Sequence, residues 1–202
     1  MPIFVLLLTL LPTLAAGSDF RIHPYLQNPT TNAATILWFS NSPTPGQLSY
    51  REQGANRDAV LVSAPKRAEA LAYTTWEDTT FFDGAAPAAP FRHRLRLENL
   101  NQATRYSYSV DQNGSRFSAS FTTAPAADQP IRFIVYADSE TEPESTGKHT
   151  DWPKTNGDER TYLLDQTSGY ANNLAVIAAR QPHFVAIAGD LVESGGEQRD
   201  WD

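Results

Sequence analysis

Residues 106–121 read YSYSVDQNGSRFSASF, two alternating segments joined at Asn113-Gly114. In both segments every second residue is aromatic, branched or alanine, and the residues between are mostly serine, as in strands with one buried face. An Asn-Gly dipeptide accepts the positive φ angles of a tight hairpin turn. The stretch therefore predicts two paired antiparallel strands and, around them, an all-β domain.

The same kind of pattern extends from about Arg21 to Thr123, where short segments rich in Thr, Tyr, Trp, Phe and Leu are separated by Pro, Gly and Asn. Further strands are expected at residues 34–38, 47–50 and 91–97. The last of these alternates charged with apolar residues, and its His93 is expected on the outer, solvent-facing side. We therefore predict a small antiparallel β-sandwich over residues 21–123.

The turn at residues 97–106 resembles that of fibronectin type III domains, in which a tyrosine after the turn bonds back to upstream backbone. Tyr106 would be that corner tyrosine. Residues 24–27, Pro-Tyr-Leu-Gln, and the following Thr-rich strand ending in Trp38 are similar to the N-terminal domain of purple acid phosphatases. This resemblance implies a fibronectin III-like sandwich.

The pattern changes after a Pro/Ala-rich linker at residues 124–130. Residues 131–136 and 183–188 are mostly apolar, like strands buried on both faces, and such strands are usually parallel. Residues 170–180 between them show helical spacing. Residues 131–202 are therefore predicted to begin a second, α/β domain with a βαβ unit, so that the fold class of the whole chain is mixed.

Each apolar strand is followed by an aspartate, Asp138 after the first and Asp190 after the second. Because the carboxyl ends of parallel strands meet at one rim of a sheet, these carboxylates are expected to lie together. Two carboxylates repel each other unless a cation binds between them, which indicates a metal site. The alternative is that each aspartate caps the loop or helix that follows its strand.

Residues 133–138, Phe-Ile-Val-Tyr-Ala-Asp, and 189–193, Gly-Asp-Leu-Val-Glu, resemble the first two motifs of the calcineurin-like metallophosphoesterases, a superfamily that includes the purple acid phosphatases. The resemblance implies an αββα-sandwich catalytic domain that hydrolyses phosphate esters with two metal ions (Fe, Mn, Zn or Mg). It also implies that Asp138 binds one metal and that Asp190 bridges both.

Two positions depart from the family pattern. The family usually has Asp-x-His in its first motif, where this chain has Glu140. Glu140 either ligates as an oxygen donor, which favours manganese, magnesium or calcium over zinc, or is a solvated loop acid. Purple acid phosphatases carry a tyrosine where this chain has Glu193, so a coloured iron–tyrosinate centre is not expected.

Residues 1–17 form an apolar run that ends in small residues and resembles a signal peptide. A membrane anchor is the alternative, but the run is interrupted by Pro12 and is shorter than the roughly 20 apolar residues that cross a bilayer. We therefore expect a secreted or periplasmic protein, free of the membrane once the signal is cleaved.

The chain has 23 acidic and 16 basic residues, a net charge of −7, and no cysteine. The absence of cysteine excludes disulfides, thiolate zinc sites and a cysteine nucleophile. An acidic chain without long charge runs argues against a nucleic-acid partner. The expected partner is a phosphate ester substrate.

The family completes its metal site with an Asn-His motif, a further histidine and a Gly-His-x-His motif, none of which follows Asp190 here. We therefore expect residues 131–202 to be an incomplete catalytic domain that is inactive alone, in a fragment of a longer enzyme. The alternative is an exported fibronectin-like module that binds a protein or polysaccharide, with a degenerate phosphoesterase remnant.

Overall fold

The structure is a computed structural model that describes residues 18–139, 149–150, 160–161, 166–192, 196 and 198–201. The predicted signal peptide at residues 1–17 lies outside the described residues. So do Glu140, whose ligand role the sequence left open, and Glu193, which stands where purple acid phosphatases carry a tyrosine.

The first of two four-stranded antiparallel sheets has the strand order β1-β2-β6-β5. Its strands are β1 (Phe20–Gln27), β2 (Ala34–Ser40), β6 (Phe91–Leu97) and β5 (Lys66–Arg67). Strand β2 is buried along its whole length, because β1 and β6 pair with its two edges and its inner-facing side chains join the core shared with the second sheet.

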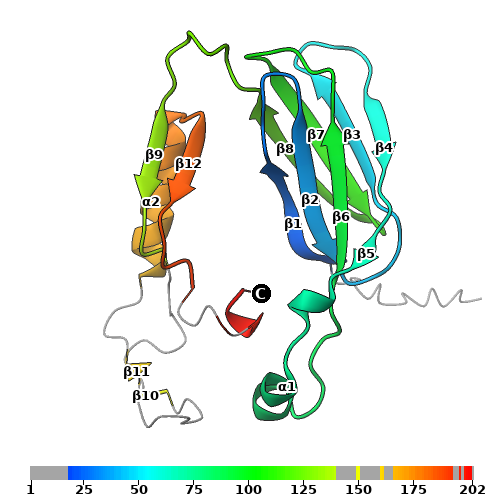
Figure 1. The fold of residues 1–202 in the computed structure, drawn as a ribbon, viewed down its shortest axis with the longest axis vertical. Coiled ribbons are helices and arrows are strands. Elements are labelled where there is room, and N and C mark those ends of the chain that lie inside the picture. The colour runs from blue at the N-terminus through cyan, green and yellow to red at the C-terminus, as the bar shows by residue number, and fades with distance from the viewer. Residues whose placement is uncertain are drawn as a thin grey trace, which may run out of the picture.

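The second sheet has the order β4-β3-β7-β8. Its strands are β4 (Ala59–Val62), β3 (Gln47–Glu52), β7 (Arg105–Gln112) and β8 (Ser115–Thr122). The two sheets lie face to face (Figure 1) and enclose one apolar core. The predicted β-sandwich is confirmed.

The hairpin between β7 and β8 forms at the predicted dipeptide. Asn113 and Gly114 have φ angles of 50° and 85°, and the strands on either side pair from Gln112 opposite Ser115 to Arg105 opposite Thr122. Both turn residues thus adopt the positive φ that a two-residue hairpin requires.

The predicted tyrosine corner is also present. The hydroxyl of Tyr106 accepts a hydrogen bond from the backbone N–H of Asn101, upstream in the turn, at 2.9 Å. The Tyr106 ring is buried and stacks on Phe121 with ring centroids 5.6 Å apart. This tyrosine therefore joins the turn to the core.

The core contains fully buried side chains from both sheets, namely Ile36, Trp38, Leu48, Leu97 and Val110. Burial of one such side chain stabilises a fold by roughly 1.5–3 kcal/mol. At one end of the core, the indole Nε1 of Trp38 donates to the side-chain oxygen of Gln112 at 3.0 Å. This bond connects β2 to β7 across the sandwich.

His93 does not face solvent, so the prediction for this residue is wrong. It is fully buried opposite Trp38, with the two rings stacked 4.7 Å apart. Its Nε2 lies 2.8 Å from Ser40 Oγ and its Nδ1 lies 2.7 Å from Ser63 Oγ. Because both ring nitrogens have a hydrogen-bond partner, the neutral imidazole can be buried without a large desolvation penalty.

The segment between β5 and β6 contains a 3₁₀ turn, η1 (Glu69–Leu71), and a short helix, α1 (Thr75–Phe81). The helix begins with a capping box, in which Thr74 and Glu77 exchange side-chain-to-backbone hydrogen bonds. Tyr73 accepts a hydrogen bond from Arg21 at 3.0 Å, which ties the segment to β1.

After the linker the chain forms β9 (Phe133–Tyr136), helix α2 (Thr167–Arg180) and β12 (Phe184–Ile187). Strands β9 and β12 pair in parallel from Phe133 opposite Phe184 to Tyr136 opposite Ile187, with α2 between them in the chain. The βαβ order is as expected (Figure 1). The other elements described in this part are the short antiparallel pair β10 (His149–Thr150) and β11 (Arg160–Thr161), and the 3₁₀ turn η2 (Gln198–Trp201).

Large apolar side chains of this second part face solvent. Phe133 and Val135 of β9 are 53% and 56% exposed, and Phe184 and Ile187 of β12 are 45% and 41% exposed. A parallel sheet is normally covered on both faces. The apolar composition of these strands is therefore suited to burial, but the residues that the structure describes do not cover them. Among the described helices, none is long and apolar enough to cross a membrane.

Candidate metal centre at the strand ends

The structure brings Asp138 and Asp190 together at the carboxyl ends of β9 and β12. The N–H of Asp138 donates to the carbonyl oxygen of Gly189 at 3.3 Å, and the N–H of Ser139 donates to that of Asp190 at 2.9 Å. These bonds continue the ladder between the parallel strands. The two aspartates therefore leave neighbouring strands at the same rim of the sheet.

Both aspartates have left-handed backbone conformations, with φ of 55° at Asp138 and 48° at Asp190. Aspartate tolerates this region better than most residues. Gly189 before the second aspartate has a φ of 145°, which only glycine adopts without strain. The backbone thus turns sharply at the end of each strand, so that these residues end the regular sheet.

The chemistry of the donors fits a hard cation. Two carboxylates at one rim offer the anionic oxygens that Mg²⁺ and Mn²⁺ prefer, and a cation between them offsets their mutual repulsion. Across the described parts of the chain, no group of three or more His, Cys, Asp or Glu side chains could hold a metal ion. Asp138 and Asp190 are therefore two candidate oxygen ligands at this rim.

A tyrosine pair lies next to this rim and connects strand to helix. The hydroxyls of Tyr136, at the end of β9, and Tyr170, in the first turn of α2, are 2.9 Å apart. The hydrogen bond with Tyr170, together with burial, raises the pKa of Tyr136 to about 12, so its phenol stays protonated at neutral pH. Tyr170 was not singled out in the sequence; the available signal was an aromatic residue early in the helix.

The other histidines described with side chains are not brought to the aspartates. The ring of His23 packs against Phe20 and Phe117 at the edge of the sandwich. The Nδ1 of His183 accepts a hydrogen bond from the N–H of Arg132 at 2.9 Å, at the opposite ends of β9 and β12. Both therefore have structural contacts away from the rim.

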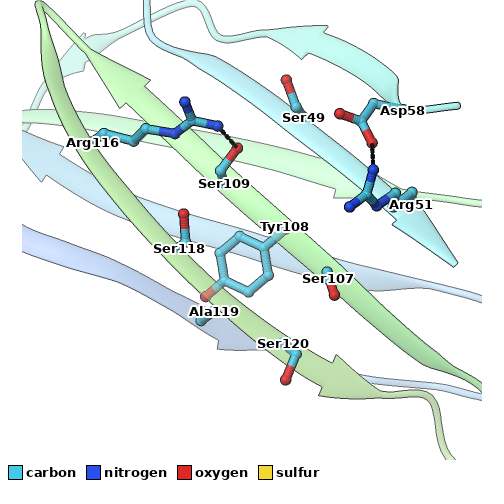
Figure 2. A pocket seen from close by; sticks show the side chains of 10 residues that line it. All are labelled: Ser49, Arg51, Asp58, Ser107, Tyr108, Ser109, Arg116, Ser118, Ala119 and Ser120. Atoms are coloured by element: carbon cyan, nitrogen blue, oxygen red, sulfur yellow. Dashed lines mark hydrogen bonds and ion pairs between the residues drawn. The ribbon is translucent and has the colours of Figure 1, made fainter. Parts of the chain in front are cut away.

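A separate hollow of about 520 Å³ lies on the outer face of β3, β7 and β8 (Figure 2). Its floor is polar and is made of Ser49, Ser107, Ser109, Ser118 and Ser120. At one side Arg116 donates to Ser109 Oγ at 3.4 Å, and at another Arg51 pairs with Asp58 at 3.6 Å. The serines alternate along both strands of the predicted hairpin, which was the sequence signal for this face.

The two-sheet sandwich with its tyrosine corner defines the chain's first domain as a fibronectin III-like fold. A family model described as purple acid phosphatase, N-terminal domain, matches residues 20–125, more than half of the 202 residues. The chain belongs to this family.

Several solved structures are similar to the chain at low sequence identity. PhoD is 13% identical with a TM-score of 0.43; the match covers 92% of this chain and 44% of PhoD. The sensor domain of the anti-sigma factor RsgI4 of Pseudobacteroides cellulosolvens is 18% identical with a TM-score of 0.31, covering 55% of this chain and 99% of that one. A computationally redesigned β-sandwich protein is 14% identical with a TM-score of 0.34, covering 52% and 93%. No curated protein matches the chain.

Proposed function

We propose that this chain carries part of the active site of a metal-dependent phosphoesterase that uses a two-metal centre. The observation that carries the proposal is the juxtaposition of Asp138 and Asp190 at the ends of parallel strands. Membership of a family defined by the N-terminal domain of purple acid phosphatases supports it. The substrate class proposed is a phosphate monoester, and the place of action is outside the cell or in the periplasm.

The proposal gives each aspartate a distinct role. Asp138 would hold one cation, and Asp190 would bridge two and reduce the repulsion between them. When bound, such a pair of cations polarises the phosphoryl oxygens and activates a water for in-line attack. Gly189 contributes indirectly, because its φ of 145° sets the direction in which the chain enters Asp190.

The backbone bonds between the strand ends hold the backbones of the two aspartates side by side. Ser139 takes part twice, since its N–H and its hydroxyl both donate to the carbonyl oxygen of Asp190, at 2.9 and 3.4 Å. Preorganised ligands lose less conformational entropy on binding, so the rim is suited to a cation even with few donors.

Paramagnetic Mn²⁺ tests the proposal directly. Titration of the protein with Mn²⁺ should broaden the amide NMR signals of residues 138–139 and 189–190 before others. Asp190→Asn should abolish this broadening, and Asp138→Asn should weaken it at least about tenfold, because each removes an anionic ligand. Asp128→Asn, at an exposed linker position, is the matched control and should leave the titration unchanged.

Hydrolysis of an aryl phosphate in the presence of Mn²⁺ is the second measurement. Any turnover should disappear in Asp190→Asn and persist in Asp128→Asn. Broadening spread evenly over surface carboxylates, or turnover that survives Asp190→Asn, would contradict a metal-dependent site at this rim.

A second candidate function is that of a binding module, and the hollow on the outer face of β3, β7 and β8 favours it. Its hydroxyls and guanidinium groups could hold a polar ligand without any metal. A protein that shows no local effect of Mn²⁺ at the strand ends but binds a soluble ligand through Ser109 and Ser118 would support this alternative.

A further inference from the structure

Strand β6 carries a row of arginines on the outer face of the first sheet. Arg92, Arg94 and Arg96 are all exposed and alternate with the inward-facing residues of the strand. In the register they lie opposite Phe39, Leu37 and Thr35 of β2, whose side chains point to the same outer face. Positions two apart in a strand are separated by about 6.8 Å, so the three charges form an evenly spaced line.

A fourth cation extends this line onto the neighbouring strand. Lys66 of β5 is the direct cross-strand partner of Arg92. Like charges placed directly opposite each other destabilise a sheet. The net charge of the whole chain is −7, so this cationic face is a local feature and does not follow from the composition.

The residues that the structure describes leave most of the charge on this face unneutralised. Arg96 forms an ion pair with Glu98 at 3.0 Å. The side chains of Arg94 and Lys66 make no hydrogen bond or ion pair with any other residue that the structure describes. Arg92 interacts with Tyr25 of β1, where its charge opposes the rise in pKa that burial gives the phenol.

Packing explains the length of these side chains but not their charge. Leu37 and Phe39 are only 6% and 7% exposed although they point outward, as arginine stems flanking them would produce. Methionine or glutamine would give similar cover without repulsion between neighbours. The guanidinium groups thus leave the face with positive charge that a negatively charged partner could meet.

We propose that the cationic row of Lys66, Arg92, Arg94 and Arg96 binds a linear acidic polysaccharide whose sulfate or phosphate groups can meet arginines about 7 Å apart. Guanidinium groups bind such oxyanions through two parallel hydrogen bonds. The row is open along its length, so a chain can lie along β6 and contact several arginines at once. This binding does not depend on the proposed hydrolytic function.

A polysaccharide fits the face better than a nucleic acid does. Single-stranded nucleic acids are held by several exposed aromatic rings on which bases stack. On this face Phe39 is buried and Tyr25, 36% exposed, is the one accessible ring among the described residues that point outward from β1, β2 and β6. The row can therefore contact a charged backbone but offers few aromatic rings on which bases could stack.

The test measures binding of the whole chain to dextran sulfate, inorganic polyphosphate, uncharged dextran and single-stranded DNA by fluorescence anisotropy or interferometry. Dextran sulfate should bind, whereas binding of polyphosphate without binding of dextran sulfate would count against a polysaccharide. Arg92→Gln/Arg94→Gln should weaken binding at least about tenfold and reduce the slope of log affinity against log salt by roughly 1.5. Arg92→Lys/Arg94→Lys should retain most of the binding, since it keeps the charge.

The matched control is Arg57→Gln/Arg105→Gln, which removes the same charge from exposed positions on the second sheet and its β3–β4 loop and should change affinity less than about twofold. Thermal unfolding of each variant distinguishes loss of a ligand contact from loss of the fold. Lys66→Gln relieves the repulsion between Lys66 and Arg92, so it should weaken binding without lowering the unfolding temperature. Equal losses in the control, unchanged binding in the β6 variant, binding of uncharged dextran, or tighter binding of DNA would each overturn the proposal.

Discussion

One buried histidine, His93, is expected to make the stability of the sandwich depend on pH. The alternation in residues 91–97 places His93 in the same row as Leu95 and Leu97, but the polarity of imidazole argued against burial. What makes burial possible is a pair of serine hydroxyls 53 and 30 residues away in sequence. No local pattern contains such partners, so this outcome needed the folded structure.

Burial lowers the pKa of His93 to about 4, while in the unfolded chain the imidazole titrates near 6.5. The unfolded state therefore binds this proton more readily. The associated stability is fully present above pH 6.5 and is lost progressively as the pH falls toward 4, by about 3 kcal/mol in all. Urea unfolding between pH 7 and 4.5 should show the loss.

The control for this effect is the matched variant His93→Gln. It should be less stable than the wild type at pH 7, yet its stability should fall less between pH 7 and 4.5, because the titrating group is gone. Identical profiles for wild type and His93→Gln would show that His93 does not contribute.

The aspartates show how far residue patterns could go at the candidate site. Because two apolar strands are each followed by Asp, the geometry of parallel sheets predicted that the two aspartates lie at the same rim. The backbone bonds at Gly189 and Asp190 match that placement. Whether they bind metal stays a prediction. Glu140 and Glu193 lie outside the described residues, so their roles remain those the sequence left open.

At the scale of elements, the segments whose structure follows from a short local sequence pattern were predicted well. The β7–β8 hairpin needed only alternation and Asn113-Gly114. Helix α1 was not predicted, although Thr74 and Glu77 have the spacing of a capping box, because seven residues are too few to show a helical period. Strand β2 is buried on both faces because the second sheet covers its inner face and neighbouring side chains cover its outer face, and its own sequence could not reveal these partners.

The hairpin turn offers a test at this scale. Gly114 has a φ of 85°, and no neighbouring atom lies close to the position that a β-carbon would take, so Gly114→Ala meets no clash and is penalised by the backbone alone. We expect a loss of about 1–2 kcal/mol in the free energy of unfolding. Gly169→Ala, at a helical position in α2 with equal space, should be neutral or slightly stabilising. Equal effects of the two variants in urea unfolding would contradict the turn geometry.

At the scale of the molecule, the two parts differ in how well they bury their apolar residues. The sandwich encloses a core from both sheets, whereas α2 has no buried residue and both strands of its sheet expose large side chains. The sequence could not predict this difference, because an apolar strand is suited to burial but does not show whether other elements cover it. The difference arises from how many layers the described residues place against each sheet.

Limited proteolysis should reveal this difference. Segments with few buried contacts open locally at low free-energy cost, so cleavage is expected first in the linker 124–130 and beyond it. A resistant fragment ending between Ala124 and Pro130 should persist, and mass spectrometry would define its end. Its core should unfold cooperatively with the same denaturant midpoint as the sandwich in the whole chain, since β1 to β8 form the core without residues 131–202. A resistant fragment that retains α2, or a sandwich that loses stability once residues after Pro130 are removed, would instead show that the βαβ unit is packed as part of one cooperative structure.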